Sequence, residues 1–199
     1  MKAKQRLCMD DKPFVLSFWG SLGAAKMNEK MEEFIKLADS NSKFYHIHAS
    51  GEGGYRTMSE HLKKYGISAD GSKDVELKRY IDNMEELITA ADIVICRAGA
   101  STIAEICASG RASIIVPSPN VAENHQEVNA RALEKEGAAV VMLEDECTGE
   151  KLYKCVEEIL KNSDKRIKME ENANKMAVLD AGDRICDIIE NIISGKVQK

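Results

Sequence analysis

Short apolar runs alternate along the chain with longer segments in which apolar residues recur every three or four positions. The short runs are typical of strands that are buried on both faces of a sheet, and "DIVIC" and "ASIIV" are the clearest of them. The longer segments are typical of amphipathic helices. The pattern predicts strands near residues 14–19, 44–49, 75–80, 92–97, 112–117 and 138–143.

Helical segments separate these strands and follow the last of them. Alternation of strands and helices is typical of βαβ units, which build a parallel sheet. We therefore predict the α/β fold class, with a doubly wound, Rossmann-like parallel sheet. Gly137 is expected to end its helix in the left-handed conformation. The expected helices lie near residues 26–38, 55–65, 84–90, 101–109, 122–137, 149–161, 164–176 and 181–193.

The composition indicates one large globular domain. The chain has 199 residues, of which 44% are hydrophobic and 31% are charged, and its formal net charge is −5. We expect residues 1–12 to be a linker remnant and residues 13–199 to form the domain. The acidic balance disfavours non-specific binding of nucleic acid. The sequence has neither an apolar run of the ~18 residues that span a bilayer nor the apolar core of a signal peptide.

The six cysteines form no CxxC pair and no spacing typical of a metal site. Several of them lie inside apolar runs, where a thiol is usually buried. We therefore expect reduced thiols in a cytoplasmic protein without a bound metal.

Open parallel sheets bind ligands beyond the carboxyl ends of their strands. In this chain four of those ends are followed by glycine-rich or polar stretches, "WGSLGA", "HASGEGG", "CRAGAST" and "VPSPNVAENHQ". An ordinary connection needs only one or two such residues. The four together predict a nucleotide or phosphate site at this edge of the sheet.

The stretch "CRAGASTIAE" is a strand-to-helix turn with two interpretations. A helix that begins at Ser101 or Thr102 would point free N–H groups at the turn and favour a phosphate, and Gly99 would let the ligand approach closely. Alternatively, Thr102 and Glu105 form a capping box that only satisfies the helix start. Arg97 could pair with a phosphate or with a neighbouring carboxylate. The residues alone leave these alternatives open.

Three further candidates each have a plain structural alternative. The stretch "GSLGA" at residues 20–24 is neither GxGxxG nor a P-loop, so it is either a phosphate loop or a tight turn. His125 and Gln126 in "NHQEVN" suit sugar hydroxyls, or belong to a solvated helix face. His46 and His48 share one face of a strand, where histidines more often pack than catalyse.

Four motifs together resemble one protein family. They are "SFWGSLGA", "HASGEG", "YIDNMEELITAADIVICRAGASTIAEICASGRASIIVPSPNVAENHQEVNA" and "DAGDRICDIIENI", in the order and at about the spacing of the C-terminal half of the MurG glycosyltransferases. The resemblance covers roughly residues 12–193. It implies one half of a GT-B fold that holds UDP-GlcNAc for inverting transfer to undecaprenyl-diphosphate-muramoyl-pentapeptide in peptidoglycan synthesis. It implies neither a cofactor nor a metal.

The resemblance also implies roles for individual residues. Ile81 would meet the uracil through its backbone, and Glu105 would accept hydrogen bonds from the ribose hydroxyls. His125 and Gln126 would hold the GlcNAc hydroxyls, with Asn129 in a supporting role. The diphosphate would lie at the helix start and under the first glycine loop, among Gly20, Ser21, Leu22, Gly23, Arg97, Gly99, Ala100, Ser101 and Thr102.

Two residues depart from the family pattern. Trp19 stands where the family usually has another glycine, so its side chain would narrow the phosphate loop or pack under it. Leu22 replaces the glutamine of some members, which removes a polar contact and leaves the backbone donors.

The family's N-terminal domain, which binds the lipid-linked acceptor and is expected to carry the general base, has no counterpart in these residues. We therefore expect a donor-binding half with UDP-GlcNAc as its partner, inactive or nearly so alone, from an enzyme on the cytoplasmic face of the membrane. An excised domain, a gene fragment and one subunit of a split transferase all fit. The alternatives in other classes are a UDP-sugar epimerase-type enzyme and a non-catalytic UDP-sugar-binding module.

Overall fold

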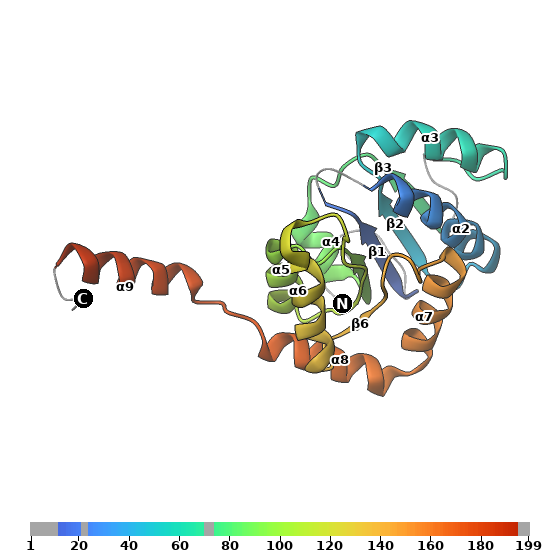
Figure 1. The fold of residues 1–199 in the computed structure, drawn as a ribbon. Helices are drawn as coiled ribbons and strands as arrows, with labels where there is room; N and C mark the ends of the chain where they lie inside the picture. The colour runs from blue at the N-terminus through green and yellow to red at the C-terminus, as the bar shows by residue number, and fades with distance from the viewer. Residues whose placement is uncertain (1–11, 21–23, 70–73, 195–199) are drawn as a thin grey trace.

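The computed structural model describes residues 12–20, 24–69 and 74–194 of the chain. Its centre is a six-stranded sheet in the order β3-β2-β1-β4-β5-β6, with every neighbouring pair parallel (Figure 1). The predicted fold class is therefore confirmed. The strands are β1 (Phe14–Phe18), β2 (Tyr45–Ala49), β3 (Val75–Lys78), β4 (Ile93–Cys96), β5 (Ala112–Ile115) and β6 (Ala139–Val141).

Helices connect consecutive strands, as the βαβ pattern requires, and three more follow β6. They are α2 (Ala25–Asn41), α3 (Glu52–Lys63), α4 (Met84–Ala90), α5 (Ala100–Ser109), the short 3₁₀ turn η1 (Ala122–Asn124), α6 (His125–Lys135), α7 (Gly149–Lys161), α8 (Ser163–Lys175) and α9 (Ala181–Ile193). Most predicted bounds agree with these within three residues.

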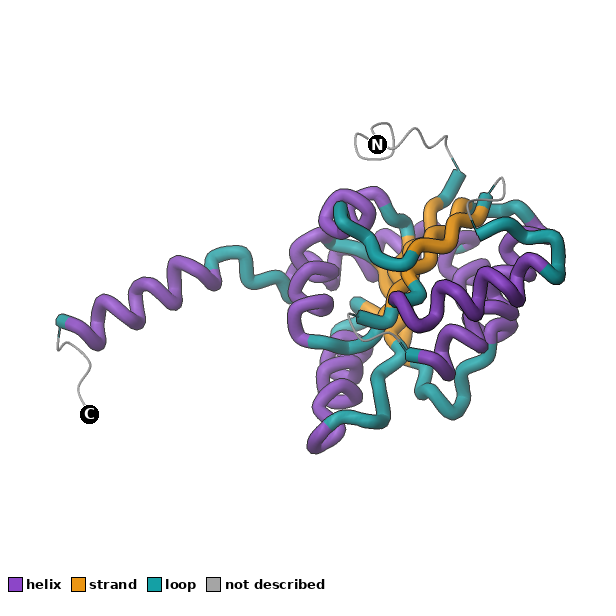
Figure 2. The backbone as a smooth tube through the Cα atoms, turned by 90° about the horizontal axis from the view of Figure 1, so that it is seen from above, coloured by secondary structure: helices purple, strands orange, loops and turns teal. Residues whose placement is uncertain are grey.

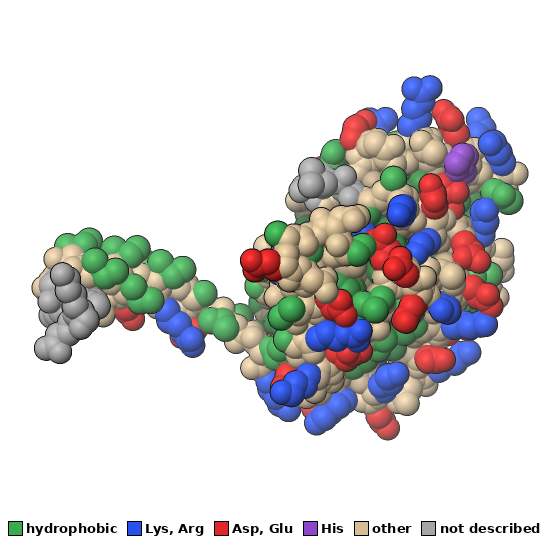
Figure 3. All heavy atoms as spheres, in the orientation of Figure 1, with side chains coloured by type: hydrophobic (Ala, Val, Ile, Leu, Met, Phe, Trp, Pro, Cys, Tyr) green, Lys and Arg blue, Asp and Glu red, His purple; other side chains and the backbone are tan. Residues whose placement is uncertain are grey.

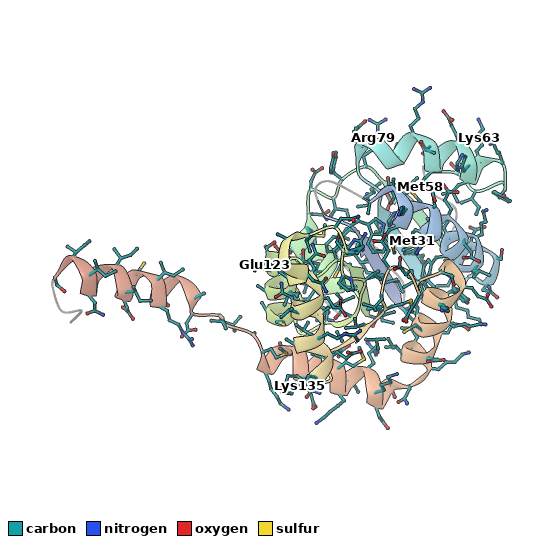
Figure 4. The ribbon with its side chains drawn as sticks, in the orientation of Figure 1. Met31, Met58, Lys63, Arg79, Glu123 and Lys135 are labelled. Atoms are coloured by element: carbon teal, nitrogen blue, oxygen red, sulfur yellow. The ribbon has the colours of Figure 1, made fainter. Side chains whose placement is uncertain are left out.

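Two hydrophobic cores lie on the two faces of the sheet, because side chains of a strand alternate between faces. Val15 of β1 faces a core that α2, α3 and α7 cover, whereas Leu16 faces a core that α4, α5 and α6 cover. Met31 and Met58 fill the first core between α2 and α3 (Figure 4). Figure 2 shows the sheet enclosed between these two helical layers.

The topology creates a switch point at the centre of the sheet. Strand β1 pairs with β2 on one side and with β4 on the other, so the connections that leave β1 and β4 run in opposite directions. A crevice opens at the carboxyl ends of two such strands, and this is where sheets of this order bind ligands.

The C-terminal helix α9 lies apart from the body formed by the sheet and its two helical layers (Figure 1). None of its residues is buried, and Ile185, Ile188, Ile189 and Ile192 form an exposed apolar stripe along it (Figure 3). Within the described residues, no helix is both long enough and apolar enough to cross a membrane.

Three smaller expectations can be compared with the structure. Gly137 has φ 68°, which confirms the left-handed stop after α6. Cys96, Cys107 and Cys147 are buried free thiols, as expected. Cys186 is free but exposed on α9, and Cys8 lies outside the described residues.

Candidate functional site

The start of α5 lies directly beyond the carboxyl end of β4, at the switch point. Gly99 is the N-cap residue, with an extended backbone at φ −66° and ψ 141°, and the first bond within the helix joins Ile103 N–H to Gly99 O at 3.0 Å. Across the described residues, no acceptor binds the N–H groups of Ala100, Ser101 and Thr102. A helix start with free N–H groups attracts an anion.

The capping-box interpretation of this turn is wrong. A capping box needs Thr102 in front of the helix, but α5 begins two residues earlier, so Thr102 is already inside its first turn. The N-cap residue is Gly99, and no side chain in the described part of the chain caps the helix. Glu105 is exposed one turn further on, and its carboxylate has no hydrogen-bond or ion-pair partner among the described residues.

Glu105 nevertheless lies within electrostatic reach of the end of β4. Burial, with the Glu105 carboxylate as the second cause, raises the pKa of the Cys96 thiol to about 12. The thiol is therefore neutral at physiological pH. Of these two groups, the Glu105 carboxylate is therefore the one that can offer a charge to a ligand.

Gly99 has room for a side chain within the protein itself. A Cβ atom built on it would meet only Thr102 Oγ1, at 3.9 Å, and its negative φ suits any residue. Neither backbone strain nor internal packing therefore requires glycine here. The open space in front of Gly99 suits a close approach by a ligand.

Side chains of α6 hold the turn between β4 and α5 from the other side. Gln126 Oε1 accepts hydrogen bonds from Ala98 N–H at 3.3 Å and from Ser118 N–H at 2.9 Å. Asn129 Nδ2 donates to Ala98 O at 3.2 Å. The Gln126 oxygen is thus occupied by the backbone, whereas no bond to its amide nitrogen is found among the described residues. Asn129 occupies a supporting position.

His125 is exposed at the first position of α6, and its ring is oriented by the preceding turn. Its Nδ1 lies 2.9 Å from Ala122 O. A carbonyl can only accept, so Nδ1 carries the proton and donates, which leaves Nε2 of the neutral ring as an acceptor. That nitrogen can receive a hydrogen bond from a sugar hydroxyl.

The helix predicted over residues 122–137 is interrupted just before His125. Glu123 and Asn124 both adopt left-handed backbone conformations, with φ 52° and 51°, so a short 3₁₀ turn precedes α6. Figure 4 shows Glu123 at this end of α6 and Lys135 at the other. Asparagine tolerates this conformation, but a glutamate does not favour it, and such strain often accompanies functional sites.

Replacing Glu123 with glycine is expected to stabilise the fold by about 0.5–1 kcal/mol, because glycine adopts a positive φ without a steric penalty. Urea denaturation measures the change. The matched control is Glu136→Gly, where φ is −82° and the same substitution should destabilise the helix end by up to about 1 kcal/mol. Equal losses in both variants would contradict the strain at Glu123.

The sequence left open whether Arg97 pairs with a phosphate or with a carboxylate, and in the structure it pairs with a carboxylate. Its Nη2 donates to Glu144 Oε2 at 2.5 Å, and its Nη1 donates to the carbonyls of Val116 and Pro117, both at 3.1 Å. The two charged side chains are only 11% and 7% exposed. A direct contact between Arg97 and a bound phosphate stays a prediction.

The loop after β1 is described only in part. Ser21, Leu22 and Gly23 lie outside the described residues, and Gly20 has φ 83°. Trp19 is buried, with its ring edge-on to His48 at 6.0 Å between centroids. The tryptophan therefore packs in the first core, and its predicted effect on the phosphate loop stays a prediction because residues 21–23 are outside the described part of the chain.

Ile81 lies between β3 and α4, half-buried against the second core. Within the described residues no acceptor is found for its backbone N–H, so this group is available to a base. It lies beyond the carboxyl end of β3, on the other side of β1 from α5. Its predicted contact with uracil is untested.

His46 and His48 are structural, as the packing interpretation predicts. His48 Nε2 lies 3.2 Å from Asn28 Oδ1, and Ser17 Oγ lies 2.8 Å from both His48 Nδ1 and His46 Nε2. The Asn28 amide nitrogen donates to Ser50 O, which fixes its oxygen as the acceptor. The neutral rings therefore form a chain in which His46 donates to Ser17, Ser17 to His48, and His48 to Asn28.

Sequence reasoning missed Glu144 and Ser118, which join the site from the segments after β6 and β5. Both line a pocket of about 290 Å³ beside Asn124 and Glu127. The only sequence signal was their position just beyond the ends of apolar strands, where many polar residues have no role in a site.

Comparisons with known proteins identify the family to which this fold belongs. The family model described as the glycosyltransferase family 28 C-terminal domain matches residues 14–185. A protein of Thermoanaerobacter sp. strain X514 is 46% identical over 92% of this chain and 49% of its own length, and one of Desulforamulus reducens is 40% identical over 92% and 50%. Both are named UDP-N-acetylglucosamine--N-acetylmuramyl-(pentapeptide) pyrophosphoryl-undecaprenol N-acetylglucosamine transferase.

Among solved structures, Acinetobacter baumannii MurG superposes with a TM-score of 0.76 at 26% identity, over 95% of this chain and 53% of that one. The chain spans about half the length of the curated relatives that it matches. The chain belongs to glycosyltransferase family 28, as a C-terminal domain of that family.

Proposed function

We propose that this chain is the donor-binding half of an inverting transferase that moves GlcNAc from UDP-GlcNAc to a lipid-linked muramoyl-pentapeptide in peptidoglycan synthesis. The names of the relatives supply the reaction. The observation that carries the proposal is the uncapped start of α5 at the switch point, with the free Glu105 carboxylate one turn away. An anion and a vicinal diol, which are the diphosphate and ribose parts of a nucleoside diphosphate, match these two features.

The start of α5 would act mainly on the leaving group. When the acceptor hydroxyl attacks the anomeric carbon, the bond to the diphosphate breaks and negative charge develops on UDP. The N–H groups of Ala100, Ser101 and Thr102, held in place by the helix, would stabilise that charge in the transition state without a costly reorganisation. This role requires no group from the acceptor side of the reaction.

The sugar would be held by α6. His125 Nε2 can accept from one hydroxyl, and the Gln126 amide nitrogen can donate to another, since their other polar atoms are held by the protein. The acceptor would reach the sugar from a separate domain, at the cytoplasmic face of the membrane. We assign the general base to that domain and to no residue of this chain.

Isothermal titration with UDP-GlcNAc tests the proposal directly. Heat of binding, together with a rise in melting temperature on addition of ligand, is the expected result. The absence of both signals at millimolar ligand would refute the proposal. Analysis of the recovered sugar nucleotide separates a transferase half from an epimerase, because only the latter would yield the C2 epimer. Restored transfer on addition of an acceptor domain would argue against a module that only binds.

Glu105→Ala is expected to weaken UDP binding at least tenfold and to leave the free energy of unfolding within about 0.5 kcal/mol of the parent, because the carboxylate makes no internal bond. Titration calorimetry and urea denaturation measure the two quantities. Glu136→Ala, another exposed helix-end carboxylate, is the control and should change neither. Unchanged UDP affinity in Glu105→Ala would remove Glu105 from the site.

A further inference from the structure

Arg97 connects three neighbouring segments at the carboxyl edge of the sheet through hydrogen bonds. It follows β4, its Nη1 donates to Val116 O and Pro117 O after β5, and its Nη2 donates to the Glu144 carboxylate after β6. The partners are 19, 20 and 47 residues away in sequence. A planar guanidinium can make several such bonds at once because its donors are fixed in one fork.

The ion pair between Arg97 and Glu144 is buried, so losing one partner would leave the other charge uncompensated. Both charged side chains are largely removed from solvent, so each depends on the other for compensation of its charge. The segment that carries Glu144 is held a second time, because Lys30 of α2 donates to the Glu144 backbone carbonyl. The carboxylate is thus presented to Arg97 from a turn that is itself anchored.

A second connection joins the same two loops. Gln126 Oε1 accepts from Ala98 N–H, next to Arg97, and from Ser118 N–H, next to Pro117. The Arg97 side chain and the Gln126 amide therefore close a ring of hydrogen bonds between the turn before α5 and the loop after β5. Among the described residues that hydrogen-bond directly to Arg97 or Gln126, Glu144 is the one that comes from outside the two loops and α6.

We propose that Glu144 is a positioning residue of the donor site, which holds Arg97 so that the turn before α5 and the loop before α6 keep a fixed separation. This rests on the proposed function, in which the first loop binds the diphosphate and α6 binds the sugar. A sugar nucleotide must span both elements, whereas uridine alone needs neither of them. Glu144 touches no ligand in this scheme and acts through Arg97.

The experiment compares two ligands in one variant. Glu144→Gln keeps the size of the side chain and removes its charge, so the grip on Arg97 weakens. By ligand-observed NMR and calorimetry, we expect its affinity for UDP-GlcNAc to fall at least tenfold and its affinity for uridine to stay within twofold of the parent. Glu146→Gln, an exposed carboxylate in the same turn, is the matched control and should alter neither affinity.

A paired variant removes the concern that Glu144→Gln only unfolds the chain. Arg97→Met combined with Glu144→Leu leaves no unpaired buried charge, so it should fold and bind uridine, yet still bind UDP-GlcNAc at least tenfold more weakly. Parental affinity for UDP-GlcNAc in both variants, or equal losses for both ligands, would overturn the positioning role alone. A parent chain that binds no UDP-GlcNAc would overturn the proposed function, and this role with it.

Discussion

Between pH 6.5 and pH 3 the folded chain is expected to lose stability progressively, because two histidines are buried in their neutral form. Burial lowers the pKa of His48 from 6.5 to about 3. Burial also lowers the pKa of His46 well below its ordinary value, and the neighbouring His48 ring lowers it further. A proton that binds either ring must do so without solvent and inside the hydrogen-bonded chain from Ser17 to Asn28.

The loss of stability at low pH follows from the different pKa of His48 in the folded and the unfolded chain. The unfolded chain binds a proton at His48 near pH 6.5, whereas the folded chain does so only near pH 3. The stabilising effect of the neutral ring is therefore complete above pH 6.5 and is lost as the pH falls toward 3. One pKa unit corresponds to about 1.4 kcal/mol, so His48 alone would destabilise the fold by about 2–3 kcal/mol at pH 4.5.

Thermal denaturation followed by circular dichroism from pH 7.5 to 4.5 measures this loss. Carboxylates also contribute to acid unfolding, so the informative quantity is the difference between variants. His48→Gln, whose amide can still accept and donate, should show a shallower fall in melting temperature than the parent. His125→Gln, at an exposed histidine, should follow the parent. Parallel pH profiles for all three proteins would contradict the prediction.

Gly149→Ala is expected to lower the free energy of unfolding by about 1–3 kcal/mol, because α7 begins against the backbone of α2. A Cβ on Gly149 would lie 2.5 Å from Phe34 N, 2.6 Å from Glu33 Cβ, and nearer still to Lys30 O. Backbone atoms of a buried helix cannot move aside as a flexible side chain can. Helix α7 would have to shift away from α2 and open the first core.

Urea denaturation measures the free energy of unfolding of this variant and of a control variant at a glycine that has space around it. Gly53→Ala, in the first turn of α3, would place its Cβ in a position with no atom within 4 Å. It should be neutral or stabilise the fold by up to about 1 kcal/mol, since alanine is the better helix former. Equal stability of the two variants would mean that the contact between α2 and α7 yields easily.

Hydrophobic periodicity was sufficient for most of the fold. The strands and helices follow from local pattern, as the agreement at Met84–Ala90, Gly149–Lys161 and Ala181–Ile193 illustrates, and the parallel sheet follows from the βαβ connections. The pattern failed at Glu123 and Asn124, where a helical sequence adopts two left-handed residues. Local preference was overridden there by the path that the loop takes into α6.

The candidate residues of the site could also be named from the sequence, but the hydrogen bonds and ion pairs among them could not be predicted. The resemblance pointed to Gln126 and Asn129, yet the structure shows the Gln126 oxygen bound to two backbone groups. Whether Arg97 faces a phosphate or a carboxylate depends on where Glu144 lies, 47 residues further along the chain. Periodicity carries no information on such a pairing.

The α/β class, the sheet edge that carries the polar loops and the family could all be recognised before folding, because each depends on local pattern or on motifs continuous along the chain. Three features emerged from the folded chain: the uncapped start of α5, the pairing of Arg97 with Glu144, and the burial of the strand histidines in their neutral form. They could not be predicted because the groups involved are far apart along the chain. Burial and hydrogen bonding at this edge are set by segments that meet only when the sheet has formed.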